Sequence, residues 1–186
     1  MKILGIDPGT RVLGYGMVDD SVRPARVLES GTLEASPRAE RPERLRVIGG
    51  QLRELLERLQ PDVVAIEKAF YGRNAATLIT LGEGRGVVLF LAAECGAAIF
   101  EYSPAEVKKS VTGLGSARKE QVAEMVRAML DGAPPDGKLD ETDALAIATC
   151  HAHRRHAVDH AAAAGTSVDA RLRGITGGRV RRGRGR

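Results

Sequence analysis

The sequence predicts an α/β domain in which helices cover one mixed β-sheet. Two short apolar segments near the N-terminus are joined by turn residues, a pattern typical of a β-hairpin. Two later segments are continuously apolar, as expected for strands that are buried on both faces. Other segments place apolar residues three or four positions apart, which predicts helices. Strands that come first and then alternate with helices favour a single sheet with helices packed against it.

Each element follows from local sequence signals. The link at residues 8–11 (PGTR) carries turn chemistry, Pro42 suits the first turn of a helix, and Pro61 ends that helix. Residues 103–106 (SPAE) form a capping box, which predicts a helix start. We expect these elements in chain order: strands at 2–7, 12–18 and 25–34, a helix from 42 to 59, a strand at 62–67, a helix capped by Asn74 and ending near Glu94, a strand at 97–102, a helix from 104, a helix capped by Ser116, and a last helix from near Asp140 to about 156.

The charge of the chain is concentrated at its C-terminal end. Residues 151–186 hold nine Arg and two Asp, a net charge of +7, so the first 150 residues carry −3 of the total of +4. A basic tail on a mildly acidic body indicates a polyanionic partner, although a solvated tail without a partner is the alternative. From about Ala157 the sequence is rich in Ala, Gly and Arg. We therefore predict a folded domain at residues 1–156 and a disordered basic tail at residues 157–186.

Composition also indicates the cellular compartment. The two cysteines, Cys95 and Cys150, give neither a disulfide framework nor metal-ligand spacing, so we expect buried, reduced thiols. The N-terminal residues lack the long apolar region of a signal peptide. The longest apolar run, residues 87–93, is too short to cross a membrane. These features predict a cytoplasmic protein with no membrane partner.

Four carboxylates are candidates for a shared site. Asp7 and Glu67 each end a predicted strand, and strand ends of an α/β sheet meet at one edge. Asp140 and Asp143 lie three residues apart on a predicted helix, so both can project from one face. Such oxygen ligands suit magnesium, and two magnesium ions can promote in-line displacement at phosphorus. Each acid alone also has a structural interpretation, as a turn former or as a residue that complements a helix dipole.

Further features have a functional and a structural interpretation. Phe70 lies in a predicted loop, where it can stack on an unpaired base or cap the core. Gly82 and Gly86 share one helix face, which indicates either a dimer contact or tight packing against the protein's own sheet. The four histidines include a pair three residues apart, but no set of partners accompanies them, so a polar helix end is favoured over a zinc site. They are His151, His153, His156 and His160.

Five segments of the chain resemble the RuvC Holliday junction resolvases. The hairpin motif alone is a weak signal, because actin-like ATPases and sugar kinases carry a similar one. Five matching segments in the expected order and spacing, from residue 1 to about 156, are highly specific. The segments are GIDPGT (5–10), AIEKAF (65–70), LGEGRG (81–86), VKKSVTGLGSARKEQV (107–122) and DETDALAIA (140–148).

The resemblance implies an RNase H-like fold with a mixed five-stranded sheet. It also implies a homodimeric endonuclease that resolves four-way DNA junctions by paired, symmetric nicks in recombination and repair. The implied cofactors are two Mg²⁺ ions per subunit, for which Mn²⁺ can substitute. The implied partners are the four-way junction and a branch-migration complex. Nothing is implied for the Arg-rich tail, which does not match the family's core.

The resemblance also assigns residue roles. The family's junction-contacting aromatic residue falls on Phe70, and its catalytic-face lysines fall on Lys108 and Lys119. In the implied reaction a water attacks phosphorus in line, and Lys119 neutralises charge on the phosphate. The family's catalytic acids, which hold the two metal ions, fall on Asp7 between the ions, Glu67 on one ion, and Asp140 with Asp143 on the other.

Two other functions compete with this interpretation. The hairpin motif is compatible with an actin-like nucleotide-binding protein, but such folds need two domains, and 186 residues leave little room for a second. Binding of ATP in a thermal-shift experiment would distinguish that class. A junction-binding module without catalysis is the second alternative, and it would not need four clustered carboxylates. Metal-dependent nicking of a synthetic junction separates these interpretations.

Overall fold

The computed structural model describes residues 1–68, 75–134 and 136–163. Three strands, β1 (Lys2–Asp7), β2 (Val12–Asp19) and β3 (Arg26–Glu34), precede helix α1 (Arg41–Leu59). Strand β4 (Val63–Glu67) is followed by α2 (Ala75–Glu94), β5 (Ala98–Tyr102), α3 (Pro104–Thr112), α4 (Lys119–Met129) and α5 (Leu139–Ala163). The predicted strands and helices are therefore present in the expected order.

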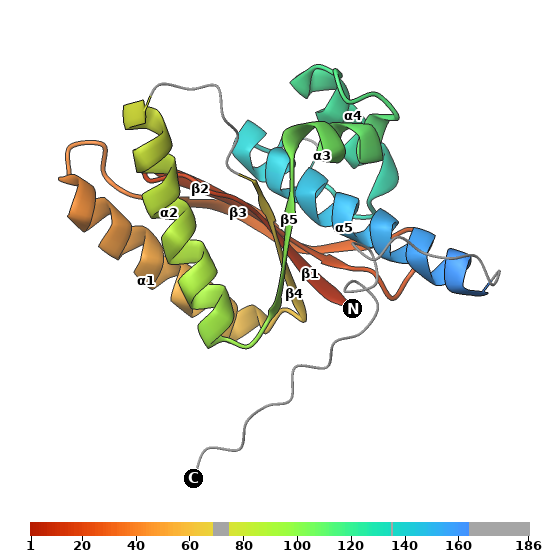
Figure 1. Ribbon diagram of the computed structural model, residues 1–186, viewed down its shortest axis with the longest axis horizontal. Coiled ribbons are helices and arrows are strands. Elements are labelled where there is room, and N and C mark those ends of the chain that lie inside the picture. Colours follow the sequence, from red (N-terminus) through yellow and green to blue (C-terminus); the bar gives the residue numbers. More distant parts are fainter. Residues whose placement is uncertain (69–74, 135, 164–186) are drawn as a thin grey trace, which may run out of the picture.

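The five strands form one mixed sheet in the order β3-β2-β1-β4-β5. The first three strands pair antiparallel, and β4 lies parallel to both β1 and β5. Helices α1 and α2 cover one face of the sheet, and α3, α4 and α5 cover the other (Figure 1). The predicted mixed five-stranded sheet flanked by helices is confirmed.

Each face of the sheet carries its own apolar core. Alternate residues of β4 point to opposite faces, so that Val63 and Ala65 pack toward α5 while Val64 and Ile66 pack toward α1 and α2. Burial on both faces explains the continuous apolar sequence of this strand. The sheet is thus held between two helical layers, and its central strands β1 and β4 are fixed from both sides.

Three sequence predictions differ from the structure. Helix α4 begins at Lys119 and not after Ser116, because the side chain of Gln121 accepts a hydrogen bond from the Arg118 backbone (3.0 Å). Cys150 is buried as expected, but Cys95 is exposed near the end of α2. The folded part also extends past residue 156, since α5 continues to Ala163 and Val158 is buried.

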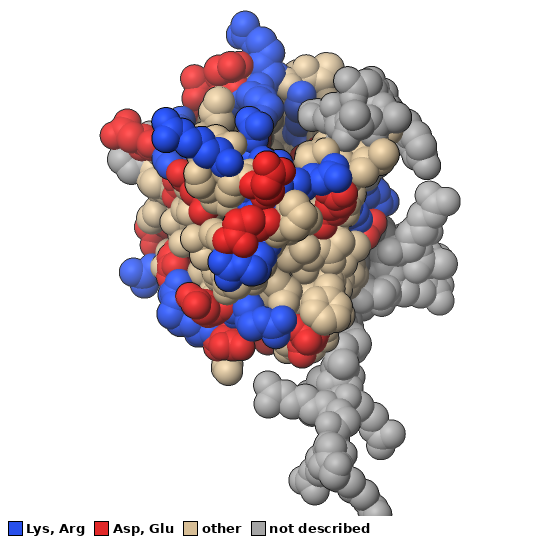
Figure 2. Space-filling model, turned by 90° about the vertical axis from the view of Figure 1, so that its left-hand side faces the viewer, with Lys and Arg blue, Asp and Glu red and all other residues tan. Residues whose placement is uncertain are grey.

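Helix α2 has an apolar outer face. The side chains of Ile79 and Phe90 are 59% and 60% exposed, and a Cβ atom added to Gly82 or Gly86 would meet nothing within 4 Å. Figure 2 views the side formed by α1 and α2, where an area without charged residues lies beside interspersed Lys, Arg, Asp and Glu. Gly82 and Gly86 therefore do not pack against the protein's own sheet.

Within the described residues, no helix has both the length and the apolar character needed to cross a membrane. The predicted helix cap Asn74 and the remainder of the predicted tail, residues 164–186, lie outside the described residues.

Candidate active site

The first two acids lie at the ends of neighbouring strands. Asp7 is the last residue of β1, and Glu67 is the last residue of β4. The two strands are parallel and pair Ile6 with Ile66, so the next residue on each strand is one of the two acids. The two strand ends therefore meet at one edge of the sheet, as predicted from the sequence, and both carboxylates face the same side of the sheet.

Two glycines allow α5 to place its acids over this edge. A Cβ atom on Gly5 of β1 would lie 2.0 Å from the Ala144 carbonyl oxygen, and one on Gly14 of β2 would lie 2.0 Å from the Asp140 carbonyl oxygen. A side chain at either position would push the helix off the sheet. These glycines are a sequence signal that was not used to predict the site. Because they let α5 lie close to the sheet, Asp140 and Asp143 come near Asp7.

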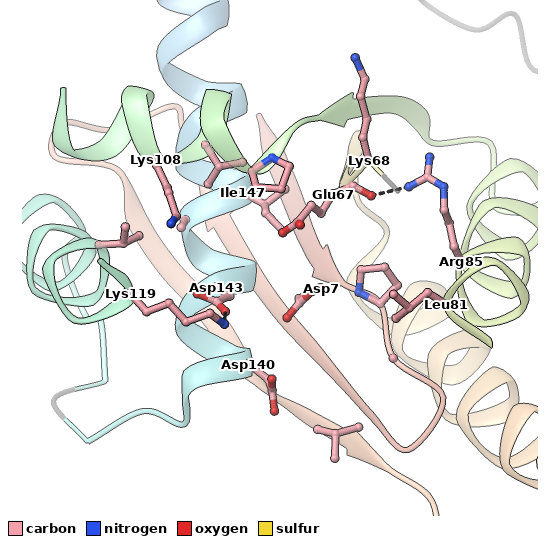
Figure 3. Close-up of a pocket in the computed structure, with 17 residues that line it drawn as sticks. Asp7, Glu67, Lys68, Leu81, Arg85, Lys108, Lys119, Asp140, Asp143 and Ile147 are labelled. Atoms are coloured by element: carbon pink, nitrogen blue, oxygen red, sulfur yellow. Dashed lines mark hydrogen bonds and ion pairs between the residues drawn. The ribbon is translucent and has the colours of Figure 1, made fainter. Parts of the chain in front are cut away.

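All four acids line one cavity of about 660 Å³. Figure 3 shows Asp7, Glu67 and Asp143 around the space between α5 and the ends of β1 and β4, with Asp140 at the start of α5. Basic residues surround them: Lys108 from α3, Lys119 from α4, Lys68 after β4 and Arg85 from α2. An acidic centre with a basic rim is the arrangement expected for cations bound next to a phosphate.

The acids repel one another. Burial and then the charges of Glu67, Asp143 and Asp140 raise the pKa of Asp7 to about 7, while Lys119 opposes them. A cluster of carboxylates that destabilises its own ionised form is costly for folding. A bound cation would remove that cost, which indicates that the cluster is built to bind positive charge.

The position of Lys119 is unfavourable for its own helix but close to the acid cluster. It occupies the first position of α4, where the helix dipole disfavours a positive charge. Its ammonium lies 2.5 Å from Asp143 Oδ2, and this contact raises the pKa of Lys119. The lysine side chain thus reaches from α4 to the acid cluster on α5 (Figure 3).

Only one of the other two predicted DNA-contacting residues lies in the described part of the chain. Lys108 lines the cavity from α3, on the same side as Lys119. Phe70 lies outside the described residues. Arg85 was not singled out from the sequence, yet it lines the cavity and donates a hydrogen bond to the Glu67 carbonyl.

The donor set fits magnesium. Within the described residues no three His, Cys, Asp or Glu side chains are already gathered closely enough to enclose a metal ion. Magnesium does not require such a cage, because it binds through one or two carboxylates and keeps water and substrate phosphate as its other ligands. Four oxygen-bearing side chains around an open cavity match that preference.

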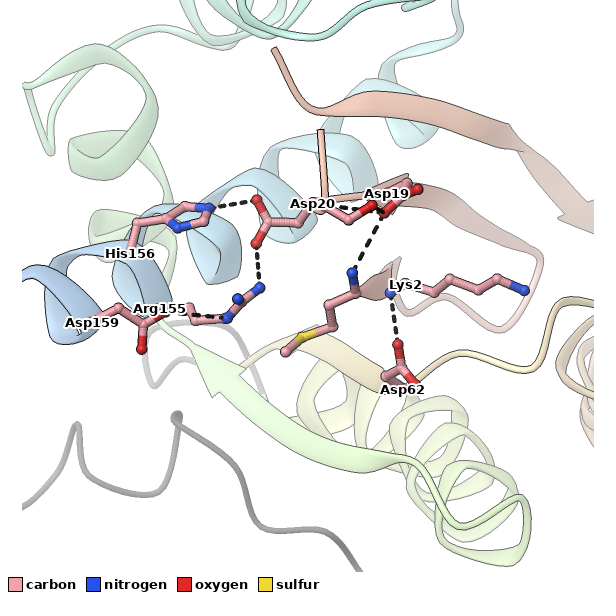
Figure 4. A network of polar contacts seen from close by, with 9 residues as sticks. Lys2, Asp19, Asp20, Asp62, Arg155, His156 and Asp159 are labelled. Carbon is pink, nitrogen blue, oxygen red and sulfur yellow. Dashed lines mark hydrogen bonds and ion pairs between the residues drawn. The ribbon is translucent and has the colours of Figure 1, made fainter. Parts of the chain in front are cut away.

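Three of the four histidines of α5 have separate structural partners. The Tyr102 hydroxyl is hydrogen-bonded to Nδ1 of buried His151 (2.7 Å), and burial lowers the pKa of His151 to about 4. His156 Nε2 lies 2.6 Å from Asp20 Oδ1, and Arg155 Nη1 donates to Asp20 Oδ2 (2.9 Å) (Figure 4). These contacts hold the end of α5 on the sheet, and they favour the polar-helix interpretation over a zinc site.

Known proteins share the part of the chain that contains the candidate site. The family profile described as "Crossover junction endodeoxyribonuclease RuvC" matches residues 3–151. This match includes all four acids and both lysines. The chain belongs to the RuvC family.

Relatives of the RuvC family match most of the chain. The crossover junction endodeoxyribonucleases RuvC of Chloroflexus aggregans and Moorella thermoacetica are 44% and 45% identical over 153 residues, which is 82% of this chain and 93% and 91% of theirs. A solved structure described as T. thermophilus RuvC in complex with Holliday junction substrate has 37% identity and a TM-score of 0.76. It covers 82% of this chain and 93% of the other. The RNase H-like resolvase fold expected from the sequence is confirmed.

Proposed function

We propose that this protein is a divalent-metal-dependent endonuclease that resolves four-way DNA junctions in recombination and repair. The observation that carries this proposal is the cavity in which Asp7, Glu67, Asp140 and Asp143 meet. These acids stand within the segment matched by the RuvC family, whose members are crossover junction endodeoxyribonucleases. A junction-binding module without catalysis would have no use for four mutually repelling carboxylates.

The four acids would hold two Mg²⁺ ions per subunit, and Mn²⁺ would substitute for them. Asp7, which feels the charge of all three other acids, would hold the ions together with Glu67, Asp140 and Asp143. When bound, such ions offset charge on the scissile phosphate and make an attacking water more acidic.

The protein's own groups would orient and neutralise the substrate. Lys108 and Lys119 lie on one side of the cavity, where their ammonium groups would contact phosphate oxygens and stabilise the extra negative charge of the transition state. The carboxylates would hold the water in line, and no protein nucleophile is needed. Phe70 would stack on an unpaired base at the crossover, because it follows Glu67 by three residues.

Paired cuts need two active sites, and the outer face of α2 would join two subunits. Ile79, Gly82, Gly86 and Phe90 recur at intervals of three or four residues and are exposed. The two glycines would let a second copy of α2 approach closely, with Ile79 and Phe90 buried at either side. The resulting homodimer would place two cavities symmetrically on one junction. The family resemblance implies a branch-migration complex as a further partner.

The experiment that tests this function compares a labelled four-way junction with a linear duplex of the same sequence. The wild-type protein is expected to nick the junction in Mg²⁺ and to leave the duplex intact. Asp143→Asn should bind the junction as well as the wild type does, because the net acidic body loses one charge that repels DNA. It should not nick the junction, because a proposed metal ligand is lost. Glu57→Gln, an exposed change on α1, is the matched control and should cleave normally. Equal nicking of duplex and junction would contradict the proposal.

A further inference from the structure

The backbone carbonyl group of Glu67, at the end of β4, cannot accept a backbone hydrogen bond from the neighbouring strand β1. The backbone N–H of Lys68 donates to the Tyr102 carbonyl on β5 (2.8 Å). The Glu67 carbonyl belongs to the same peptide group but points the opposite way, toward β1. In a continued parallel ladder the donor to this carbonyl would be the residue after Asp7. That residue is Pro8, which has no N–H to donate.

Arg85 supplies the donor that Pro8 cannot. Its guanidinium Nη1 donates to the Glu67 carbonyl oxygen (Figure 3). Its Nη2 lies 2.5 Å from Glu101 Oε1 on β5. The Arg85 side chain is only 14% exposed, unlike the arginines of the surface ion pairs. A planar guanidinium can make both contacts at once, which fixes its orientation.

Arg85 also reaches this position from a fixed helix. A Cβ atom on the preceding Gly84 would lie 3.2 Å from both the Gly9 carbonyl oxygen and Thr10 Cγ2, in the turn that follows Asp7. Helix α2 therefore packs directly against the β1–β2 turn. The guanidinium is held between the ends of β4 and β5, beside the acid cluster but bonded to the backbone.

We propose that Arg85 is a positioning residue for Glu67. By holding the last carbonyl of β4, it fixes the backbone from which the Glu67 carboxylate projects into the cavity. The inference rests on the proposed function, in which Glu67 is a ligand of a divalent cation. Partners that orient metal ligands in this way commonly change metal affinity or activity by about 10–100-fold when they are removed.

The test uses Mn²⁺ binding, followed by electron paramagnetic resonance on the whole protein without DNA, as well as cleavage. Arg85→Leu should weaken Mn²⁺ binding by about 10-fold or more and raise the Mg²⁺ concentration for half-maximal cleavage by a similar factor. Junction affinity in EDTA should stay at the wild-type value. Arg85→Lys keeps one donor for the carbonyl and should give an intermediate Mn²⁺ affinity. Glu101→Gln keeps the arginine and should have a smaller effect than Arg85→Leu.

Arg53→Leu is the matched control, because Arg53 pairs with Glu94 (2.9 Å) at the far end of α2 and lies outside the cavity. It should bind Mn²⁺ and cleave like the wild type. If circular dichroism shows that Arg85→Leu does not fold, the other two variants carry the test. Mn²⁺ affinity should then fall from the wild type to Glu101→Gln, and further to Arg85→Lys.

Two results would overturn the inference. Wild-type Mn²⁺ affinity in the Arg85 variants would show that the carbonyl contact does not position Glu67. Weakened junction binding in EDTA with intact Mn²⁺ binding would show that Arg85 contacts phosphate directly. A wild-type protein that neither binds Mn²⁺ nor cleaves would instead contradict the proposed function itself, so the two failures are distinguishable.

Discussion

Replacing Asp7 with Asn is expected to stabilise the metal-free protein at alkaline pH. Burial raises the pKa of Asp7 from 3.8 to about 7, with the neighbouring carboxylates acting in the same direction. A carboxyl group with a raised pKa binds more protons in the folded than in the unfolded state, so the folded state loses stability as pH rises from 3.8 to about 7. Asparagine does not ionise and therefore avoids this loss.

The expected size follows from the same shift. A rise of about three pKa units, at about 1.36 kcal/mol each, gives an upper bound of about 4 kcal/mol. Because the cavity is open to solvent, screening lowers this to roughly 1–2 kcal/mol. For a domain of this size, about 1 kcal/mol shifts the melting temperature by about 2–4 °C. Asp7→Asn should therefore melt about 2–8 °C above the wild type at pH 8 in EDTA.

Calorimetry of both proteins in EDTA at pH 8 and pH 5 measures this difference. The gain should shrink at pH 5, where Asp7 of the folded wild type is protonated. Mn²⁺ should raise the melting temperature of the wild type more than that of the variant, since the cation replaces repulsion with attraction. Glu57→Gln should show no such pattern. A variant that melts at or below the wild-type temperature at pH 8 in EDTA would refute the electrostatic reasoning.

Three further variants test other parts of the protein. Phe70→Ala should slow cleavage of an intact junction more than cleavage of one already unpaired at the crossover, and equal slowing would indicate a packing role. Gly86→Leu should convert the dimer to a monomer by light scattering, whereas an unchanged mass would exclude this face of α2 as the interface. Deletion of residues 164–186, which hold seven Arg, should weaken binding at low salt. It should also flatten the dependence of log affinity on log salt by about 0.9 for each DNA phosphate that the tail neutralises in the full chain. An unchanged slope would show that the tail does not bind DNA.

The sequence was informative where local signals and the fold agree. Apolar alternation, proline positions and the capping box at Ser103 predict most element boundaries to within a few residues, because these signals act between near neighbours. The meeting of Asp7 and Glu67 was also predictable, since parallel strands that end together place their last residues side by side. Their approach to Asp140 and Asp143 followed from the family resemblance.

The remaining features depend on contacts between distant parts of the chain. The extension of α5 beyond residue 156 is stabilised by Asp20, a buried carboxylate more than 130 residues away that binds Arg155 and His156. The Ala-rich sequence of that segment gave no indication of this partner. Arg85 was missed for the same reason, because its role depends on a carbonyl that Pro8 leaves without a ladder donor. The exposure of Cys95 depends on where α2 ends, which composition does not determine.

The acids at the ends of β1 and β4 and on α5 are proposed to hold the catalytic cations, and the proposed cleavage reaction depends on this. A crystal structure grown with Mn²⁺, with its anomalous scattering measured, tests it most directly. Two peaks are expected in the cavity on either side of Asp7, one within about 2.2 Å of a Glu67 oxygen and the other at a similar distance from Asp140 or Asp143. A protein that cleaves junctions in the same Mn²⁺ solution but shows no peak in this cavity would contradict the proposal.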